Sequence, residues 1–112
     1  MKLVLARLSI WNFKMGKREE GFAELDRILN TSVRGTTGFR GYISLISNDD
    51  VNAATILTLW QDQESLQASE KGVFSSAITK VQDFLETPPQ FKNFKVFSTE
   101  LFMRSEFEAS FY

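Results

Sequence analysis

One stretch, residues 54–62 (Ala-Thr-Ile-Leu-Thr-Leu-Trp-Gln-Asp), constrains the fold more than any other part of the chain. It is rich in β-branched and apolar residues, which is typical of a β-strand. Both of its faces carry apolar side chains, so we predict an interior strand that is covered on both sides. Asp62 can cap a following helix, because its carboxylate accepts from the first free N–H groups. Trp60 is therefore expected at a strand end beside a helix N-terminus, where pockets are common.

The chain before this stretch supplies two strands and a helix. An imperfect alternation over 3–13 predicts the first strand, and a helical period over 17–33 predicts the first helix. Residues 39–47 predict a second strand, which the polar hairpin 48–52 joins to the 54–60 strand. In strict alternation, this second strand places Phe39 and Tyr42 on opposite faces. The expected apolar stripe of the helix is Phe22, Leu25, Ile28, Leu29 and Val33.

The chain after residue 62 predicts a second helix and a last strand. The helix is expected from Gln63 to about Leu85, with Gly72 bending or dividing it. Thr87-Pro88-Pro89 is interpreted as its end, because proline cannot donate and disfavours a preceding helical residue. The last strand is predicted over 94–103. The expected apolar stripe of the helix is Phe74, Ala77, Ile78, Val81 and Leu85.

Composition limits the classes of function. With 112 residues, we expect a single domain over 1–112, with the tail 104–112 loose or docked on a partner. The chain has no Cys and no His, which excludes thiol nucleophiles, Cys/His zinc sites, Ser-His-Asp triads and imidazole ligation of haem. A net charge of -1 with mixed signs gives no electrostatic basis for nucleic acid or membrane as a partner. The absence of Cys fits a cytoplasmic location.

The order of predicted elements is β-α-β-β-α-β. This is an α+β, ferredoxin-like arrangement with an antiparallel sheet in the order 4-1-3-2 and both helices on one face. The two helical stripes suffice to cover only that face. The other face still presents apolar side chains, which a soluble monomer seldom exposes over so large an area. We therefore expect a homodimer whose subunits pack sheet to sheet, a dimeric α+β barrel.

Three segments carry a resemblance to a known family: Gly38-Phe39-Arg40-Gly41-Tyr42, residues 56–66 (Ile-Leu-Thr-Leu-Trp-Gln-Asp-Gln-Glu-Ser-Leu), and Phe74 at the head of a helical stripe. Over roughly 2–103 the chain resembles the antibiotic biosynthesis monooxygenase domain of the dimeric α+β barrel superfamily. The resemblance implies a pocket between helices and sheet, lined by Trp60. It also implies oxidation of a hydrophobic aromatic or quinol-like molecule, with molecular oxygen as co-substrate and neither cofactor nor metal.

The candidate site residues follow from this resemblance and from strand positions that could reach a cavity. Arg7 or Arg40 could bind a phenolate or quinone oxygen. Against these roles, Arg40 and Tyr42 could face solvent or a subunit contact, and Trp60 could be core packing. The candidate catalytic residues are Trp60 and Arg40, and the candidate substrate-binding residues are Arg7, Asn12, Tyr42, Trp60, Phe74 and Ile78.

Two other functions stay open at the level of sequence. One is a non-catalytic dimer that binds a small molecule or serves a stress response. The other is haem handling. The haem-degrading branch that the chain resembles uses an amide on the first strand and a histidine on the second helix, at positions we align with Ala6 and Ile78. Without histidine, another ligand such as Tyr42 would be needed. A metal site of Asp49, Asp50 and Asp62 is not favoured, because acidic residues in hairpins usually keep a turn solvated.

Overall fold

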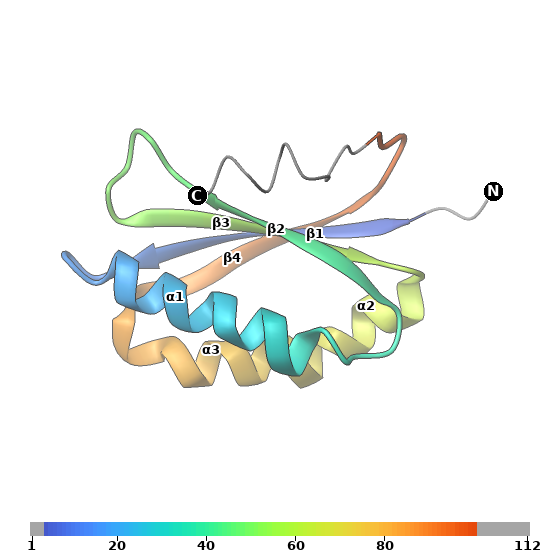
Figure 1. Cartoon of the computed structure of the whole chain (residues 1–112), viewed down its shortest axis with the longest axis horizontal. Helices are drawn as coiled ribbons and strands as arrows, with labels where there is room; N and C mark the ends of the chain where they lie inside the picture. Colours follow the sequence, from blue (N-terminus) through green and yellow to red (C-terminus); the bar gives the residue numbers. More distant parts are fainter. Residues whose placement is uncertain (1–3, 101–112) are drawn as a thin grey trace.

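The computed structural model describes residues 4–100, which form one four-stranded antiparallel sheet with helices on one face (Figure 1). The strands are β1 (Leu5–Phe13), β2 (Phe39–Ile46), β3 (Ala53–Trp60) and β4 (Leu85–Lys95). The helices are α1 (Arg18–Ile28), α2 (Gln63–Ser69) and α3 (Ser75–Val81), with π-helical turns η1 (Leu29–Val33) and η2 (Glu70–Phe74) and the 3-10 turn η3 (Gln82–Phe84). The strand order β2-β3-β1-β4 confirms the predicted ferredoxin-like fold and the interior position of β3.

The alternation of β3 and β1 determines what faces the helices. In β3, Ala54, Ile56, Thr58 and Trp60 are buried under the helices, as predicted, while the intervening residues are half-buried on the far face. Antiparallel pairing sets Arg7 opposite Thr58 and Ser9 opposite Ile56. Paired residues share a face. The interior between sheet and helices therefore receives a guanidinium and two hydroxyl groups among apolar side chains.

The first helix and the start of the second follow their local sequence. The predicted stripe of the first helix is buried in full, and it runs through α1 into η1. At the N-terminus of α2, the Oδ1 atom of Asp62 accepts from the Ser65 backbone N–H at 2.8 Å, which confirms the predicted cap. Trp60 accordingly ends β3 two residues before the cap, at the predicted junction of strand and helix.

The prediction of the last strand is wrong. β4 spans 85–95, so Thr87-Pro88-Pro89 lies inside a strand instead of ending a helix, and 96–100 is not strand. The prolines are tolerated because β4 is an edge strand and its pairing with β1 shifts register between Ile10 and Asn12, opposite the two prolines. The predicted strand residues 101–103 and the tail 104–112 lie outside the described residues.

A further departure concerns β2, whereas the second helix divides as expected. In β2 the pairs Phe39–Trp60 and Gly41–Leu59 leave Arg40 as an extra residue, and this bulge puts Phe39 and Tyr42 on the same face, not on opposite faces as predicted. Gly41 has a φ of 144°, which glycine adopts readily. The second helix is divided into α2, η2 and α3, and the dividing turn contains Gly72, as predicted.

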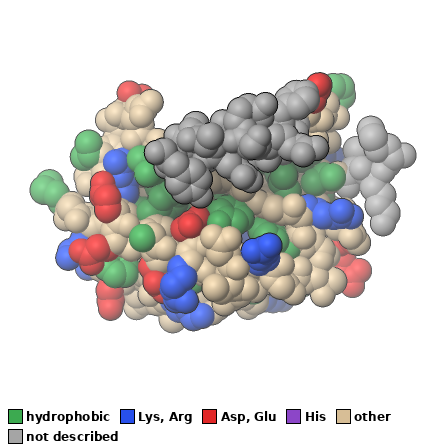
Figure 2. All heavy atoms as spheres, in the orientation of Figure 1, with side chains coloured by type: hydrophobic (Ala, Val, Ile, Leu, Met, Phe, Trp, Pro, Cys, Tyr) green, Lys and Arg blue, Asp and Glu red, His purple; other side chains and the backbone are tan. Residues whose placement is uncertain are grey.

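The far face of the sheet remains apolar and open among residues 4–100. Ile10, Leu45 and Phe94 are 39%, 49% and 46% exposed there. Elsewhere, acidic and basic side chains are interspersed, as the view of the α1 side shows (Figure 2). Within 4–100, no helix is long and apolar enough to cross a membrane.

Candidate functional site

A small cavity lies between the sheet and the helices. Its volume is about 30 Å³, enough for roughly two water molecules. Its sheet side is formed by Arg7, Ser9, Trp11, Ile56, Thr58 and Trp60, and its helix side by Leu25, Ile28, Leu29, Val33, Val73, Phe74 and Ala77. The side chains from β1 and β3 supply all of its polar groups, while the helices supply only apolar ones.

Two Trp–hydroxyl pairs form part of the sheet side. The Trp60 Nε1–H donates to the Thr58 Oγ1 atom at 3.0 Å, and the Trp11 Nε1–H donates to the Ser9 Oγ atom at 2.8 Å. In each pair the partners are two residues apart, on the same face of a strand. Both indoles are buried, at 1% and 2% exposure. Trp60 is therefore at once part of the core and part of the cavity wall, so the two sequence-based interpretations of this residue coexist.

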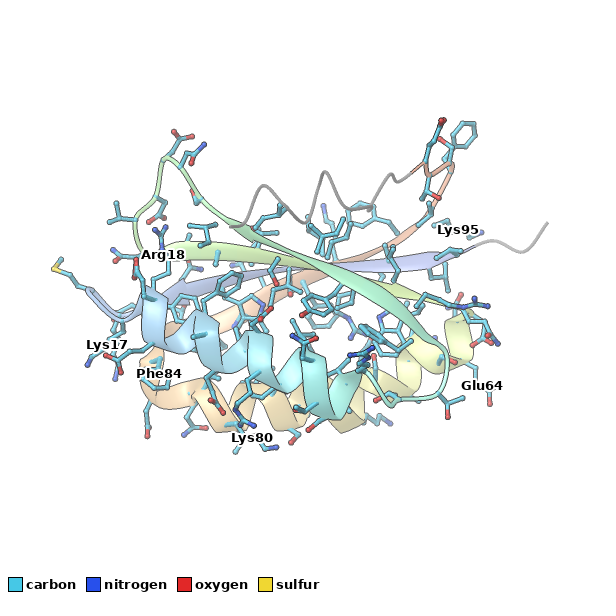
Figure 3. All side chains as sticks on the ribbon, viewed as in Figure 1. Lys17, Arg18, Glu64, Lys80, Phe84 and Lys95 are labelled. Atoms are coloured by element: carbon cyan, nitrogen blue, oxygen red, sulfur yellow. The ribbon has the colours of Figure 1, made fainter. Side chains whose placement is uncertain are left out.

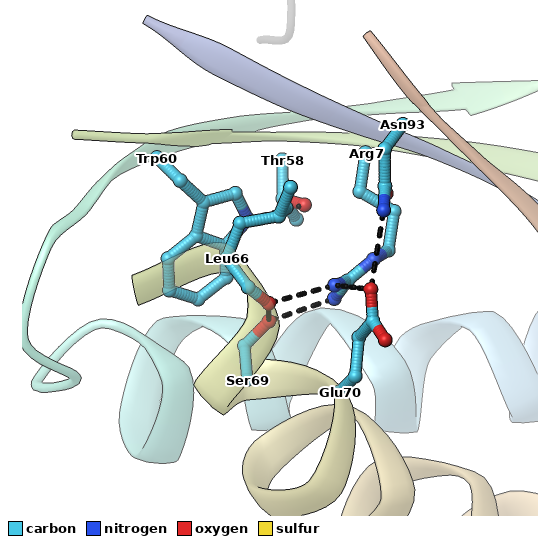
Figure 4. Close-up of polar contacts among 7 residues, drawn as sticks. All are labelled: Arg7, Thr58, Trp60, Leu66, Ser69, Glu70 and Asn93. Atoms are coloured by element: carbon cyan, nitrogen blue, oxygen red, sulfur yellow. Dashed lines mark hydrogen bonds and ion pairs between the residues drawn. The ribbon is translucent and has the colours of Figure 1, made fainter. Parts of the chain in front are cut away.

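Arg7, the third residue of β1, contributes a buried positive charge. Its side chain is 2% exposed. The Nη1 group donates to the Ser69 Oγ atom at 2.8 Å, and the Nη2 group donates to the Leu66 carbonyl at 2.9 Å (Figure 4). Nη2 also lies 3.2 Å from the Oε1 atom of Glu70, whose side chain is 33% exposed. The same Oε1 accepts from the Asn93 amide at 3.1 Å, so Glu70 connects η2 to both β1 and β4.

The guanidinium of Arg7 is incompletely satisfied. Its Nε atom is buried and has no hydrogen-bond partner within residues 4–100. Its Cζ atom lies over the rings of Phe74 and Phe91, at 4.8 and 5.3 Å from their centroids. Burial lowers the pKa of Arg7, and the neighbouring Glu70 carboxylate opposes that shift. A buried cation of this kind needs its anionic partner, and it offers one further N–H donor beside the cavity.

The route from the cavity to solvent passes η2. Of the lining residues, only Val73 and Phe74 are partly exposed, and the other eleven are buried. The Phe74 ring meets the rings of Trp11 and Phe91 edge to face, at centroid distances of 5.9 and 5.1 Å. No residue of η2 is buried. Phe74 therefore closes the cavity from a turn that is itself at the surface.

Of the candidate residues named from the sequence, the structure brings Arg7, Trp60 and Phe74 together at the cavity. The other four candidate residues do not line the cavity. Arg40 is exposed and donates to the Gln61 Oε1 atom at 3.1 Å. Asn12 lies on β1 between Ala53 and Thr87, beyond the cavity.

Tyr42 and Ile78 also lie away from the cavity. The Tyr42 hydroxyl donates to the Asp26 Oδ1 atom at 3.1 Å, so the alternative of a tyrosine-ligated haem has no ligand at this cavity. Ile78 lines a surface groove with Leu85 and Pro88. Ala6, which we aligned with the amide of the haem-degrading branch, faces the far side of the sheet, opposite Leu59.

Several site residues were missed from the sequence, among them Ser9, Thr58 and Glu70. Ser9 and Thr58 share a strand face with Arg7 and Trp60, so the alternation that located those two could have found them. Glu70 gave no such signal, because its approach to Arg7 depends on the π-helical turn. Within 4–100, no group of three acidic side chains could hold a metal ion.

Comparisons with known proteins place the fold. The sequence matches no protein-family model and no curated protein. A Nitrosomonas europaea structure named "putative antibiotic biosynthesis monooxygenase" is similar with a TM-score of 0.73 and 15% identity, covering 87% of this chain and 93% of that one. A structure of the same name from Bordetella bronchiseptica is similar with a TM-score of 0.71 and 12% identity, covering 90% of this chain and 100% of that one. A Bacteroides thetaiotaomicron protein of unknown function, described as a "possible oxidoreductase", is similar with a TM-score of 0.69 and 18% identity, covering 86% of this chain and 100% of that one.

These similarities establish a shared fold across nearly the whole described chain. The fold is the one expected from the resemblance of residues 38–42 and 56–66 to the monooxygenase family. At 12–18% identity, the likeness carries no residue roles from those proteins to this one. The chemistry has to be argued from the cavity itself.

The Tyr42 hydroxyl provides a pH test of the described geometry. Burial, and then the charge and hydrogen bond of Asp26, raise the pKa of Tyr42 to about 12. The fold thus favours the protonated phenol. Its contribution to stability is expected to be complete below pH 10 and lost as the pH rises through 12. The absorbance difference between the wild type and Tyr42→Phe, recorded during an alkaline titration, should show a midpoint near 12. A midpoint near 10 would contradict the Tyr42–Asp26 contact.

Proposed function

We propose that this protein is a cofactor-independent monooxygenase that acts on an electron-rich aromatic molecule, a phenol or quinol, in the cavity beneath α1 and η2. The observation that carries the proposal is the buried guanidinium of Arg7 beside a cavity whose other walls are aromatic and aliphatic. Such a site favours a flat apolar ring with an anionic oxygen directed at Arg7. The names of the similar structures from N. europaea and B. bronchiseptica agree with this class of reaction.

The reaction needs no external reductant. A phenol with a free para position reacts with O₂ to give a quinone and water, and the ring supplies all the electrons. The difficult step is transfer of an electron from the ring to O₂, which is easier from the phenolate than from the phenol. Arg7 stabilises the phenolate, and the apolar walls exclude water from the reactive intermediates. The Ser9 and Thr58 hydroxyls accept from the indole N–H groups, so they orient Trp11 and Trp60 in the wall.

The size of the cavity sets a condition on the proposal. A naphthol ring is far larger than the 30 Å³ available. The part of the wall that can give way is η2, since Val73 and Phe74 are its only partly exposed lining residues. Binding therefore requires η2 to move outward, taking the Phe74 ring off Trp11.

A second candidate function is binding without turnover. It is favoured by the absence of a proton acceptor among the described lining side chains: within residues 4–100 no carboxylate lines the cavity, and both hydroxyls are engaged by indoles. Such a protein would carry or sense an aromatic molecule and would consume no oxygen.

We also propose that the protein is a homodimer that buries the apolar far face of the sheet. Sedimentation equilibrium should give twice the mass of the 12.8 kDa chain. Leu45→Glu places a charge on that face and should shift the population towards monomer. Lys80→Glu, on the helical side of the molecule (Figure 3), is the control and should leave the dimer intact. A stable 12.8 kDa particle from the wild type would contradict the dimer.

Oxygen uptake with 1-naphthol tests the activity. The wild type should consume O₂ and form 1,4-naphthoquinone in equal amounts, and Arg7→Lys should lower the rate by about tenfold or more. Arg40→Lys changes the other arginine proposed from the sequence, which lies outside the cavity, and should leave the rate unchanged. Circular dichroism checks that both variants fold. Absence of uptake by the wild type across a panel of phenols and quinols, or equal losses in the two variants, would contradict the proposal.

A further inference from the structure

The turn η2 presents two groups to Arg7, a carboxylate and an aromatic ring. The Glu70 Oε1 atom is 3.2 Å from the Arg7 Nη2 atom, and the centroid of the Phe74 ring is 4.8 Å from the Arg7 Cζ atom. The two residues are four apart in a π-helical turn, which closes over about five residues and so brings both to one side. A benzene ring and a carboxylate are thus held together against one buried cation.

These two groups are more exposed than the contacts that Arg7 makes with α2. The Glu70 side chain is 33% exposed, and Phe74 is partly exposed. Ser69 and Leu66, which hold the guanidinium from α2, are 2% and 3% exposed. Within η2, Gly72 has open space where a side chain would lie, so few contacts fix the middle of the turn.

We propose that Glu70 and Phe74 occupy the site in place of its ligand, and that this ligand is a small aromatic carboxylate. Its carboxylate replaces that of Glu70 at Arg7, and its ring replaces the Phe74 ring. The inference deepens the proposed function and rests on the cavity being the binding site. The substrate would then be an aromatic acid with a ring hydroxyl ortho to the carboxylate, so that Arg7 reaches the phenol oxygen as well as the carboxylate.

Charge balance selects a carboxylate. Moving Glu70 away without an incoming anion leaves a buried arginine unpaired, which is strongly unfavourable. A phenol has a pKa of about 10 and is neutral at pH 7, whereas an aromatic carboxylate is ionised there. The Nε–H of Arg7, which has no partner within residues 4–100, offers the incoming carboxylate an additional donor. The ring takes the volume that Phe74 vacates, next to the 30 Å³ of existing space.

The test compares benzoate with benzamide, which has nearly the same shape and no charge. Binding is followed by quenching of tryptophan fluorescence, because the chain has two Trp residues and both line the cavity. Glu70→Gln removes the resident charge and should tighten benzoate binding by about tenfold while leaving benzamide unchanged. Glu70→Asp, whose carboxylate is one methylene shorter, should act in the same direction. Glu70→Asp can therefore replace Glu70→Gln in this test if Glu70→Gln does not fold.

Two further variants separate the roles of charge and ring. Phe74→Ala opens the space for the ring and should tighten the binding of benzoate and of benzamide to a similar extent. Glu64→Gln removes an exposed carboxylate from the N-terminal turn of α2 (Figure 3) and should leave the binding of both probes unchanged. If Glu70→Gln left benzoate binding unchanged, weakened it, or improved both probes equally, Glu70 would have a structural role only and the inference would be overturned. Failure of benzoate to bind any folded form would overturn it too.

The outcome is separable from that of the oxygenase proposal. Selective tightening of benzoate without oxygen uptake from any phenol would retain this inference and remove the enzyme. Oxygen uptake from 1-naphthol, with no effect of Glu70→Gln on benzoate, would retain the enzyme and remove the inference.

Discussion

The buried charge of Arg7 is the constraint on which the rest of the site depends. A guanidinium that is 2% exposed is stable only with acceptors and an anion close by, and β1 alone offers neither. The acceptors come from the end of α2, and the anion comes from Glu70 on η2. Arg7 therefore ties the second helical segment to the centre of the sheet. The same contacts position Phe74 over the cavity, so the closure of the cavity and the neutralisation of Arg7 are parts of one arrangement.

Most of the fold could be predicted because it depends on local sequence patterns. The alternation of β3, the helical stripe that runs through α1 into η1, and the Asp62 cap each depend on residues close in sequence. The error at β4 arose where local and tertiary rules conflict. Pro88 and Pro89 end most helices and strands, but an edge strand with a register shift has no N–H contact to lose there. Nothing in the local sequence indicates that shift, because it is set by the partner strand.

The site was harder to predict than the fold. Arg7, Trp60 and Phe74 could be named because strand alternation, or the head of a helical stripe, points them towards the helices. Arg40 and Tyr42 were named on an unbroken β2, and the bulge at Gly41 makes Arg40 the extra residue. Glu70 escaped because the break predicted at Gly72 carries no sign that the chain forms a π-helical turn there. Side chains that approach from irregular backbone carry no periodic signal, and here one of them supplies the counterion of the site.

Within residues 4–100 nothing engages the Nε–H of Arg7, so a ligand in the cavity can accept from it. The most direct measurement is the ¹H–¹⁵N resonance of that group, assigned by its loss in Arg7→Lys. On titration with benzoate, we expect a large shift of the Arg7 Nε–H signal, with slower exchange with water, while the side-chain signals of exposed arginines stay in place. A signal that stays in place when benzoate is bound, or one that moves no more than those of the exposed arginines, would show that Arg7 does not bind the ligand through this group.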